Sequence, residues 1–267
     1  MLASVFFGAI VGFIAALTGA GGGILAVPLL VFGLNLTLAQ AAPIGLMATG
    51  ASAALGAILA HRQGRVRYRA ATLMALAGMM LTPLGVWSAS RVPTRPLTIL
   101  FALVLAYVGY RTYTKADNVA SDGSIGHATR SIPCKLDESV GRLIWTVPCA
   151  RVLAGWGMVV GLLSGMLGVG GGFVIVPTLQ GYTNLDMRSI VPTSLAVISM
   201  VSIAGVIASA MAGGMNWTIA LPFSGGALVG MIGGRFGGAK LPGVILQKSF
   251  AGLCIVVAIA LIVRTVL

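Results

Sequence analysis

An internal repeat constrains the fold of this chain more than any other feature of its sequence. The stretch from Val11 to Leu46 aligns without a gap to the stretch from Val160 to Leu195, at an offset of 149 residues (160 − 11 = 149). A single register held over so many residues indicates an internal duplication. Identical pairs in this register include Gly12/Gly161, Gly19/Gly168, Gly21/Gly170, Gly22/Gly171, Gly23/Gly172, Val27/Val176, Pro28/Pro177, Asn35/Asn184, Pro43/Pro192, Gly56/Gly205, Gly85/Gly234 and Phe101/Phe250.

Composition predicts that both halves lie in a membrane. Of the 267 residues, 58% are hydrophobic and only 8% are charged, whereas a soluble domain carries about 25% charged residues. Many of the apolar segments approach the roughly 20 residues that a helix needs to cross the hydrocarbon core. Each half has five of them, at 2–18, 24–33, 38–60, 71–90 and 97–113, and at 152–167, 173–182, 190–209, 217–234 and 244–263.

The second apolar segment of each half is too short to span a membrane. Three glycines precede it and a proline lies within it: Gly21–Gly23 with Pro28, and Gly170–Gly172 with Pro177. Glycine permits backbone conformations that other residues avoid, and broken backbone is tolerated in a membrane where protein or a water-filled cavity satisfies it. We therefore predict an all-α polytopic membrane protein of two repeats, each with a Gly-rich helix break or re-entrant hairpin plus three spanning helices.

The distribution of basic residues predicts how the halves are oriented. If each half crosses the membrane an odd number of times and the basic loop at 61–70 is cytoplasmic, fourteen of the 17 Lys and Arg residues lie inside. If each half crosses four times, the split is eleven to six. The positive-inside rule favours the first arrangement, in which the halves are inverted, as in alternating-access transporters. The predicted organisation is a first repeat at 1–113, a polar cytoplasmic linker at 114–150, and a second repeat at 151–267.

The glycine triplets are predicted to bind an anion. Successive free N–H groups at the start of a helix form an anion-binding concavity, and matching breaks in two repeats point to a shared site near the midplane. The predicted substrate-binding residues are Gly21, Gly22, Gly23, Gly170, Gly171 and Gly172. The alternative interpretation is that these glycines only permit close packing of helices.

Polar side chains near the breaks are candidates to complete this site. They are Asn35, Asn184, Thr49, Ser52, Thr193 and Ser194. Each hydroxyl has an alternative role, a hydrogen bond back to its own helix. Arg91 and Lys240 are equivalent in the repeat, and we expect them either to attract anions to the two mouths or to anchor helices at the interface.

The placement of acidic residues also favours an anion. Four of the five Asp and Glu residues lie in the linker and the fifth, Asp186, lies in a loop, whereas cation carriers commonly hold a carboxylate within the membrane. We expect no cofactor, no metal site and no catalytic residues, and the net charge of +12 is attributed to topology rather than to nucleic-acid binding. Cys134, Cys149 and Cys254 show no metal-ligand spacing and are predicted to be free, and residues 136–145 are expected to form an amphipathic piece.

The chain resembles the TauE/SafE family of sulfite exporters, also called TSUP. The resemblance rests on GAGGGILAVPLL, on GVGGGFVIVPTL, on Pro43 and Pro192, and on the repeat itself. It implies a bacterial inner-membrane transporter that exports sulfite or organosulfonates. Proton coupling and a homo-oligomeric state are both compatible with the sequence. The alternatives are a passive anion channel of the same architecture and an importer of a related sulfur anion.

Overall fold

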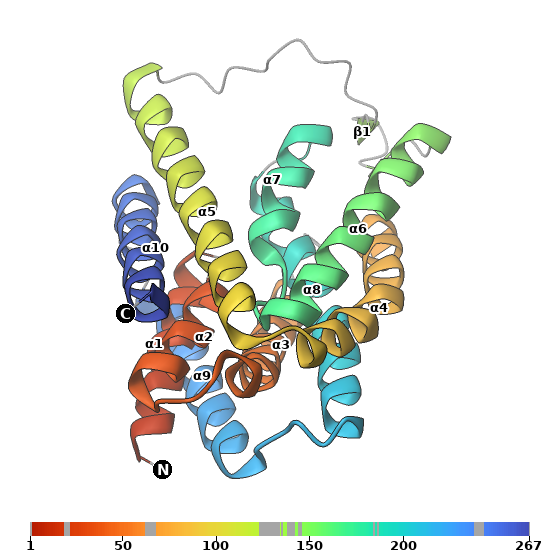
Figure 1. The fold of residues 1–267 in the computed structure, drawn as a ribbon. Helices are drawn as coiled ribbons and strands as arrows, with labels where there is room; N and C mark the ends of the chain where they lie inside the picture. The colour runs from red at the N-terminus through yellow and green to blue at the C-terminus, as the bar shows by residue number, and fades with distance from the viewer. Residues whose placement is uncertain are drawn as a thin grey trace.

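Segments that lie in lipid have no water to satisfy their N–H and C=O groups, so they fold as helices. The computed structural model describes residues 2–18, 22–61, 68–122, 134, 136–137, 142–143, 146–183, 185, 187–237 and 243–266. The first half contains α1 (Leu2–Thr18), α2 (Gly22–Gly33), α3 (Leu38–His61), α4 (Tyr68–Arg91) and α5 (Thr94–Asp122). The second contains α6 (Val147–Leu167), α7 (Gly172–Tyr182), α8 (Met187–Met211), α9 (Trp217–Gly237) and α10 (Gly243–Val266) (Figure 1). The predicted all-α membrane fold is confirmed.

The helix boundaries preserve the internal duplication. Helices α3 and α8 begin at Leu38 and Met187, α4 and α9 at Tyr68 and Trp217, and α5 and α10 at Thr94 and Gly243. Each of these pairs is separated by the same 149 residues that align the two halves in sequence. The third, fourth and fifth helices of the halves are therefore equivalent in position as well as in sequence.

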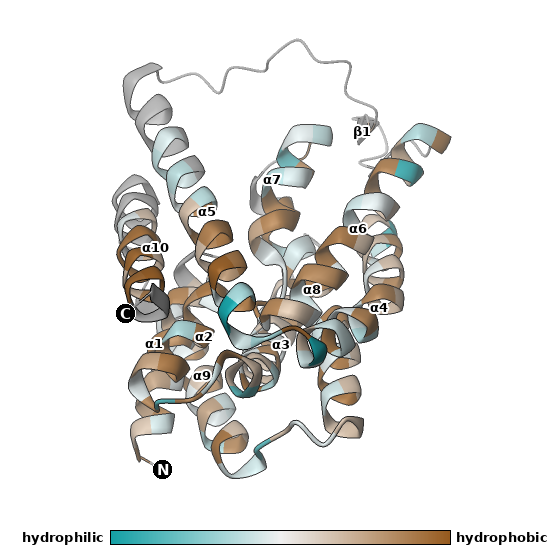
Figure 2. Ribbon diagram, in the orientation of Figure 1, coloured by the Kyte–Doolittle hydropathy of each residue, from teal (hydrophilic) through white to brown (hydrophobic). Residues whose placement is uncertain are grey.

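Helices α2 and α7 are short, as predicted. They have 12 and 11 residues, which at 1.5 Å per residue reach less than about 20 Å, against a hydrocarbon core of about 30 Å. Among the described residues, six helices are long and apolar enough to span a membrane: α3, α4, α5, α6, α8 and α9. They carry exposed apolar residues such as Leu76, Met80, Leu103 and Val229, which suits contact with lipid. Hydrophobic residues, in brown, recur along the helices in Figure 2.

The two halves are interleaved through their first and fourth helices, because α1 packs along α9 and α6 packs along α4. Glycines allow both contacts. A Cβ added at Gly12 would lie 1.9 Å from the Ala227 carbonyl oxygen, and one added at Gly161 would lie 2.1 Å from the Gly78 carbonyl oxygen. Gly12 and Gly161 are equivalent in the repeat, and so are Gly78 and Ala227. One backbone-to-backbone contact is thus made twice, with the halves exchanging roles.

The third helices of the two halves, α3 and α8, also pack against each other, and so do the fifth helices, α5 and α10. Gly50 of α3 lies against Ser202 of α8, where a Cβ added to the glycine would be 2.5 Å from the serine Cβ. These contacts place α3 and α8 at the centre of the molecule, next to both glycine breaks.

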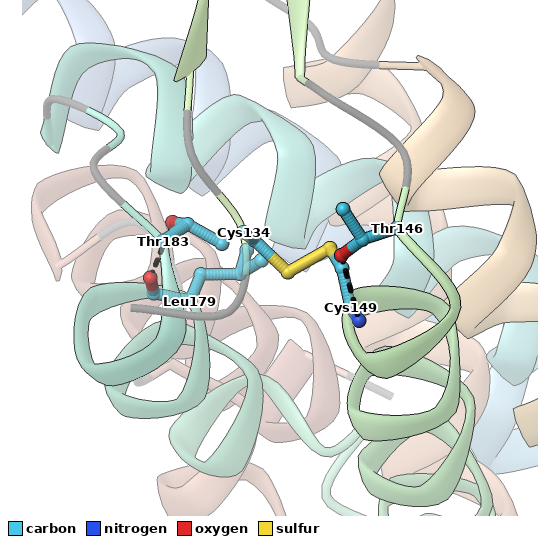
Figure 3. The surroundings of a disulfide bond; sticks show 5 residues. All are labelled: Cys134, Thr146, Cys149, Leu179 and Thr183. Carbon is cyan, nitrogen blue, oxygen red and sulfur yellow. Dashed lines mark hydrogen bonds between the residues drawn. A yellow bond between two sulfur atoms is a disulfide. The ribbon is translucent and has the colours of Figure 1, made fainter. Parts of the chain in front are cut away.

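The described part of the linker differs from the prediction in its cysteines. Cys134 and Cys149 form a disulfide, so only Cys254 is a free cysteine, and it is buried (Figure 3). The pairing could not be seen in the sequence because it arises where the linker folds back onto the start of α6. Within the segment expected to be amphipathic, β1 (Leu136–Asp137) pairs antiparallel with β2 (Arg142–Leu143), and residues 138–141 and 144–145 lie outside the described residues. Cys134 also forms a parallel β-bridge with Thr183, so this cystine joins the start of α6 to the end of α7.

Candidate substrate-binding site

The second glycine break is a turn that requires glycine. Gly168, Gly170 and Gly171 have φ values of 73°, 74° and 71°, the left-handed region that side chains rarely adopt. Gly168 ends α6, and its N–H donates to the Ser164 carbonyl oxygen at 2.9 Å. A Cβ added at Gly168 would lie 2.3 Å from the Ala42 Cα of α3. The second break is therefore seated directly on a helix of the first half.

This break leaves a row of backbone N–H groups without partners. Among the described residues, the N–H groups from Val169 to Phe173 donate no hydrogen bond of normal length and angle, and donation resumes at Val174 and Ile175, both to the Gly171 carbonyl oxygen. Val169 to Gly172 are buried. Because an unpartnered buried N–H costs about as much as a lost hydrogen bond, such a row needs a ligand or ordered water. Successive N–H groups of this kind form an anion-binding nest.

The first break lies against the second. A Cβ added at Gly23 would be 2.3 Å from the Val169 carbonyl oxygen and 2.9 Å from the Thr49 Cγ2. Thr49 in turn reaches the second break, because its Oγ1 would lie 3.2 Å from a Cβ added at Gly170. Thr49 of α3 is thus in contact with both breaks.

A small cavity of about 20 Å³ lies where the two breaks meet. Helix α3 contributes Thr49, Ser52 and Ala53, and α8 contributes Leu195 and Ile198. The remaining lining residues are Ala15, Gly22, Gly23, Val169 and Met231. The pocket is small, its lining is mostly apolar, and none of the lining residues is charged.

The two hydroxyls in this pocket donate hydrogen bonds to carbonyl oxygens of their own helix. Thr49 Oγ1 donates to the Gly45 carbonyl oxygen at 2.8 Å, and Ser52 Oγ donates to the Ala48 carbonyl oxygen at 2.8 Å. A hydroxyl has one proton and two lone pairs. In this conformation the oxygens of Thr49 and Ser52 can only accept further hydrogen bonds.

The architecture is that of a known transporter family. The family model described as "Sulfite exporter TauE/SafE" matches residues 4–261. The chain belongs to the TauE/SafE family. This membership agrees with six candidate spans and identifies the chain as a multi-pass bacterial membrane transporter rather than an enzyme.

Curated relatives of this TauE/SafE chain are also named as transporters. A "Probable membrane transporter protein" of Xylella fastidiosa (strain 9a5c) is 29% identical over 272 residues, which are 99% of this chain and 96% of the relative. The "Probable membrane transporter protein YunE" of Bacillus subtilis (strain 168) is 25% identical over 245 residues, or 88% of this chain and 86% of the relative. No solved structure matches the chain.

The predicted site residues of this TauE/SafE chain divide into three groups. Gly22, Gly23, Thr49 and Ser52 line the pocket, and Gly170, Gly171 and Gly172 form the adjoining break. Gly21, Asn184 and Lys240 lie outside the described residues. Thr193, Ser194, Asn35 and Arg91 are described and lie elsewhere than in the pocket lining.

Local structure explains why these four residues lie elsewhere. Thr193 and Ser194 are buried and donate to the Ser189 and Val191 carbonyl oxygens, at 2.6 Å and 2.8 Å. The residues of α8 that line the pocket are instead Leu195 and Ile198. Asn35 is exposed in the turn between α2 and α3, where its φ of 52° is one that asparagine tolerates. Arg91 is exposed, with its guanidinium 4.9 Å from the centre of the Trp87 ring, a pairing typical of an interfacial anchor.

Sequence reasoning missed the apolar wall of the pocket. Ala15, Val169, Leu195, Ile198 and Met231 line it, and none of them carries a polar group that would single it out. A signal does exist in the repeat register, because Ile198 is the equivalent of Thr49.

Proposed function

We propose that this protein is a secondary transporter that exports small sulfur oxyanions, such as sulfite or organosulfonates, by alternating access. The anion is bound where the two glycine breaks meet. The observation that carries this proposal is the row of unpartnered, mostly buried N–H groups from Val169 to Phe173 beside the pocket. Within a membrane such donors need an acceptor, and an oxyanion supplies several oxygen acceptors at once.

The charge of the lining supports an anion over a cation. None of the residues that line the pocket is Asp or Glu, and its polar side chains are the hydroxyls of Thr49 and Ser52. Cation sites within membranes commonly rely on a carboxylate. The choice of sulfur rests on the family description, "Sulfite exporter TauE/SafE", rather than on the pocket.

The orientation of the hydroxyls supports transport of a protonated anion. Because the protons of Thr49 and Ser52 are donated to their own helix, their lone pairs face the ligand. Sulfite takes up a proton near neutral pH, and that proton can be donated to a hydroxyl oxygen while the remaining oxygens accept from the break. Moving the protonated form carries one proton out with each anion, so export should depend on pH without a carboxylate in the protein.

The alternating-access part of the proposal requires inverted halves. In Figure 1, α1 begins at the lower edge of the view, whereas its equivalent α6 begins at the upper edge. The exchanged contacts of α1 with α9 and of α6 with α4 support a two-fold relation between the halves. The fourteen-to-three division of basic residues supports a cytoplasmic linker.

The Cys134–Cys149 disulfide favours a periplasmic linker instead, because disulfides persist mainly in oxidising compartments. Fluorescent-protein and alkaline-phosphatase fusions after Asp122 and after Leu267 address both questions. We expect the first junction to be cytoplasmic and the second periplasmic. A periplasmic first junction would reverse the orientation in favour of the disulfide, and two junctions on one side would contradict inversion.

Sulfite efflux from liposomes tests the function directly. Purified protein is reconstituted into vesicles loaded with sulfite, and efflux is followed at several concentrations with and without an imposed pH gradient. We expect saturable efflux that changes with the gradient and is absent from protein-free vesicles. Efflux that neither saturates nor responds to the gradient would indicate a passive channel instead.

A further inference from the structure

Ser202 of α8 packs against Gly50 of α3, but its buried hydroxyl makes no hydrogen bond among the described residues. It is 1% exposed, and its Oγ has no hydrogen-bond partner among the described residues. This differs from the usual behaviour of a serine in a membrane helix, which donates back to its own helix. A buried hydroxyl left unpaired is unfavourable, so its retention calls for an explanation.

The position of Ser202 supplies that explanation. A Cβ added at Gly170 would lie 3.7 Å from the Ser202 Oγ and 3.2 Å from the Thr49 Oγ1. Gly170 is in the middle of the row of free N–H groups, so the Ser202 hydroxyl is directed at the same place as those donors. Gly50 of α3 also lies next to this hydroxyl, because a Cβ added at Gly50 would be 3.2 Å from the Ser202 Oγ.

The repeat register shows that these hydroxyls of α3 and α8 stand at positions that are not equivalent. Ser202 is the equivalent of Ala53, which lines the pocket, while Thr49 and Ser52 are the equivalents of Ile198 and Val201. The two helices therefore present different chemistry to the region between them. Helix α3 offers two hydroxyls whose protons are already donated, and α8 offers one whose proton is free.

We propose that Ser202 donates a hydrogen bond to the transported oxyanion at the second break and so contributes to anion affinity. Thr49 and Ser52 cannot donate to the anion while their hydroxyls donate to their own helix, whereas the Ser202 hydroxyl can. This inference rests on the proposed function, because the ligand is the same sulfur oxyanion. The free N–H groups and the Ser202 hydroxyl then surround the charged oxygens from the break and from α8.

A thermal-shift experiment on purified full-length protein tests the proposal. The probes are sodium sulfite, thiosulfate, sulfate and sulfoacetate, with sodium chloride at matched ionic strength as the baseline. Ser202→Ala is compared with Ser209→Ala. Ser209 lies two turns further along α8, is 3% exposed and likewise has no partner among the described residues, but its Oγ is not one of the atoms found beside Gly170. Ser202→Cys keeps a weak donor of similar size.

We expect the anion that stabilises the wild type to bind Ser202→Ala about tenfold more weakly, the loss expected when a hydrogen bond to a charged group is removed. Ser209→Ala should bind like the wild type, and Ser202→Cys should fall between. If the wild type is stabilised and Ser202→Ala is stabilised equally, the Ser202 proposal is overturned while the proposed function stands. If no sulfur anion stabilises the wild type, the proposed function itself fails, and this inference with it.

Discussion

Helices α3 and α8 derive from the same half-sequence, yet they form different walls of the candidate site. The wall from α3 carries the hydroxyls of Thr49 and Ser52, and the wall from α8 carries the apolar side chains of Leu195 and Ile198. On α8 the polar contribution moves to Ser202, at a position that is alanine on α3. In the proposed site the two helices thus supply complementary groups to a single ligand rather than two copies of one site.

The glycine breaks differ in a related way. The second break has three described glycines with positive φ and a row of free N–H groups. The described part of the first break, Gly22 and Gly23, already belongs to α2 and packs against Ala15 and the Val169 carbonyl oxygen. In this account the second break is the main source of donors, and the first break positions it.

Gly171→Ala should give the largest effect, because it acts on the break that supplies the donors. Alanine would have to adopt a φ of 71°, and its Cβ would lie 2.4 Å from the Val160 Cγ1. We expect a loss of about 1–3 kcal/mol in stability from the backbone conformation alone, together with loss of sulfite efflux. Gly171 caps the start of α7, and the control is Gly181→Ala near the end of that helix, where nothing lies within 4 Å of the added Cβ. Equal efflux from the two variants would reduce the second break to a connecting turn.

Thr49→Val should give the next largest effect, because it gives α3 the apolar character that Ile198 has on α8. The substitution keeps the branched shape and removes the oxygen that faces the pocket. We expect the KM for sulfite to rise about tenfold. Thr82→Val is the matched control, because Thr82 is also buried and donates to the carbonyl oxygen four residues earlier, at 2.7 Å, but lies outside the pocket lining. An unchanged KM for Thr49→Val would show that the Thr49 hydroxyl of α3 does not contribute to sulfite binding.

The disulfide should affect stability more than transport. Among the described residues it ties together α6 and α7 of the second half, and α1 and α2 have no such link. Cys149→Ser should lower the melting temperature under oxidising conditions, since a disulfide that closes a loop of this length contributes about 3 kcal/mol in the chain-entropy account. Wild-type protein treated with a reductant should have the same melting temperature as the Cys149→Ser variant. A melting temperature that responds neither to the reductant nor to the substitution would show that the two thiols are unpaired in solution.

The sequence predicted the architecture well because lipid limits the choices. The apolar segments, their lengths and the repeat offset lead directly to helices and to two short ones, since helices satisfy their backbone without water. Thr49 and Ser52 were also predicted as site residues, and they line the pocket. Thr193 and Ser194 were chosen by the same reasoning but lie off the face of α8 that carries Leu195, Ile198 and Ser202, which recur at helical spacing.

Other features required the fold. The free N–H row follows from the φ values of Gly168, Gly170 and Gly171, which no sequence pattern states. Ser202 stands out because its hydroxyl lacks the usual bond to its own helix, a property invisible in the residue type. The Cys134–Cys149 pair depends on how the linker folds back, and the spacing of two cysteines does not reveal that path.

Calorimetric titration of sulfite into purified double variants tests the central claim, that one anion is held between unlike walls at the meeting point of the breaks. The informative protein is Thr49→Val with Ser202→Ala, which removes one hydroxyl from each wall, and the control is Thr82→Val with Ser209→Ala. The account predicts that the control binds sulfite like the wild type and that the first variant shows no measurable binding. Equal affinities in all three proteins would contradict it.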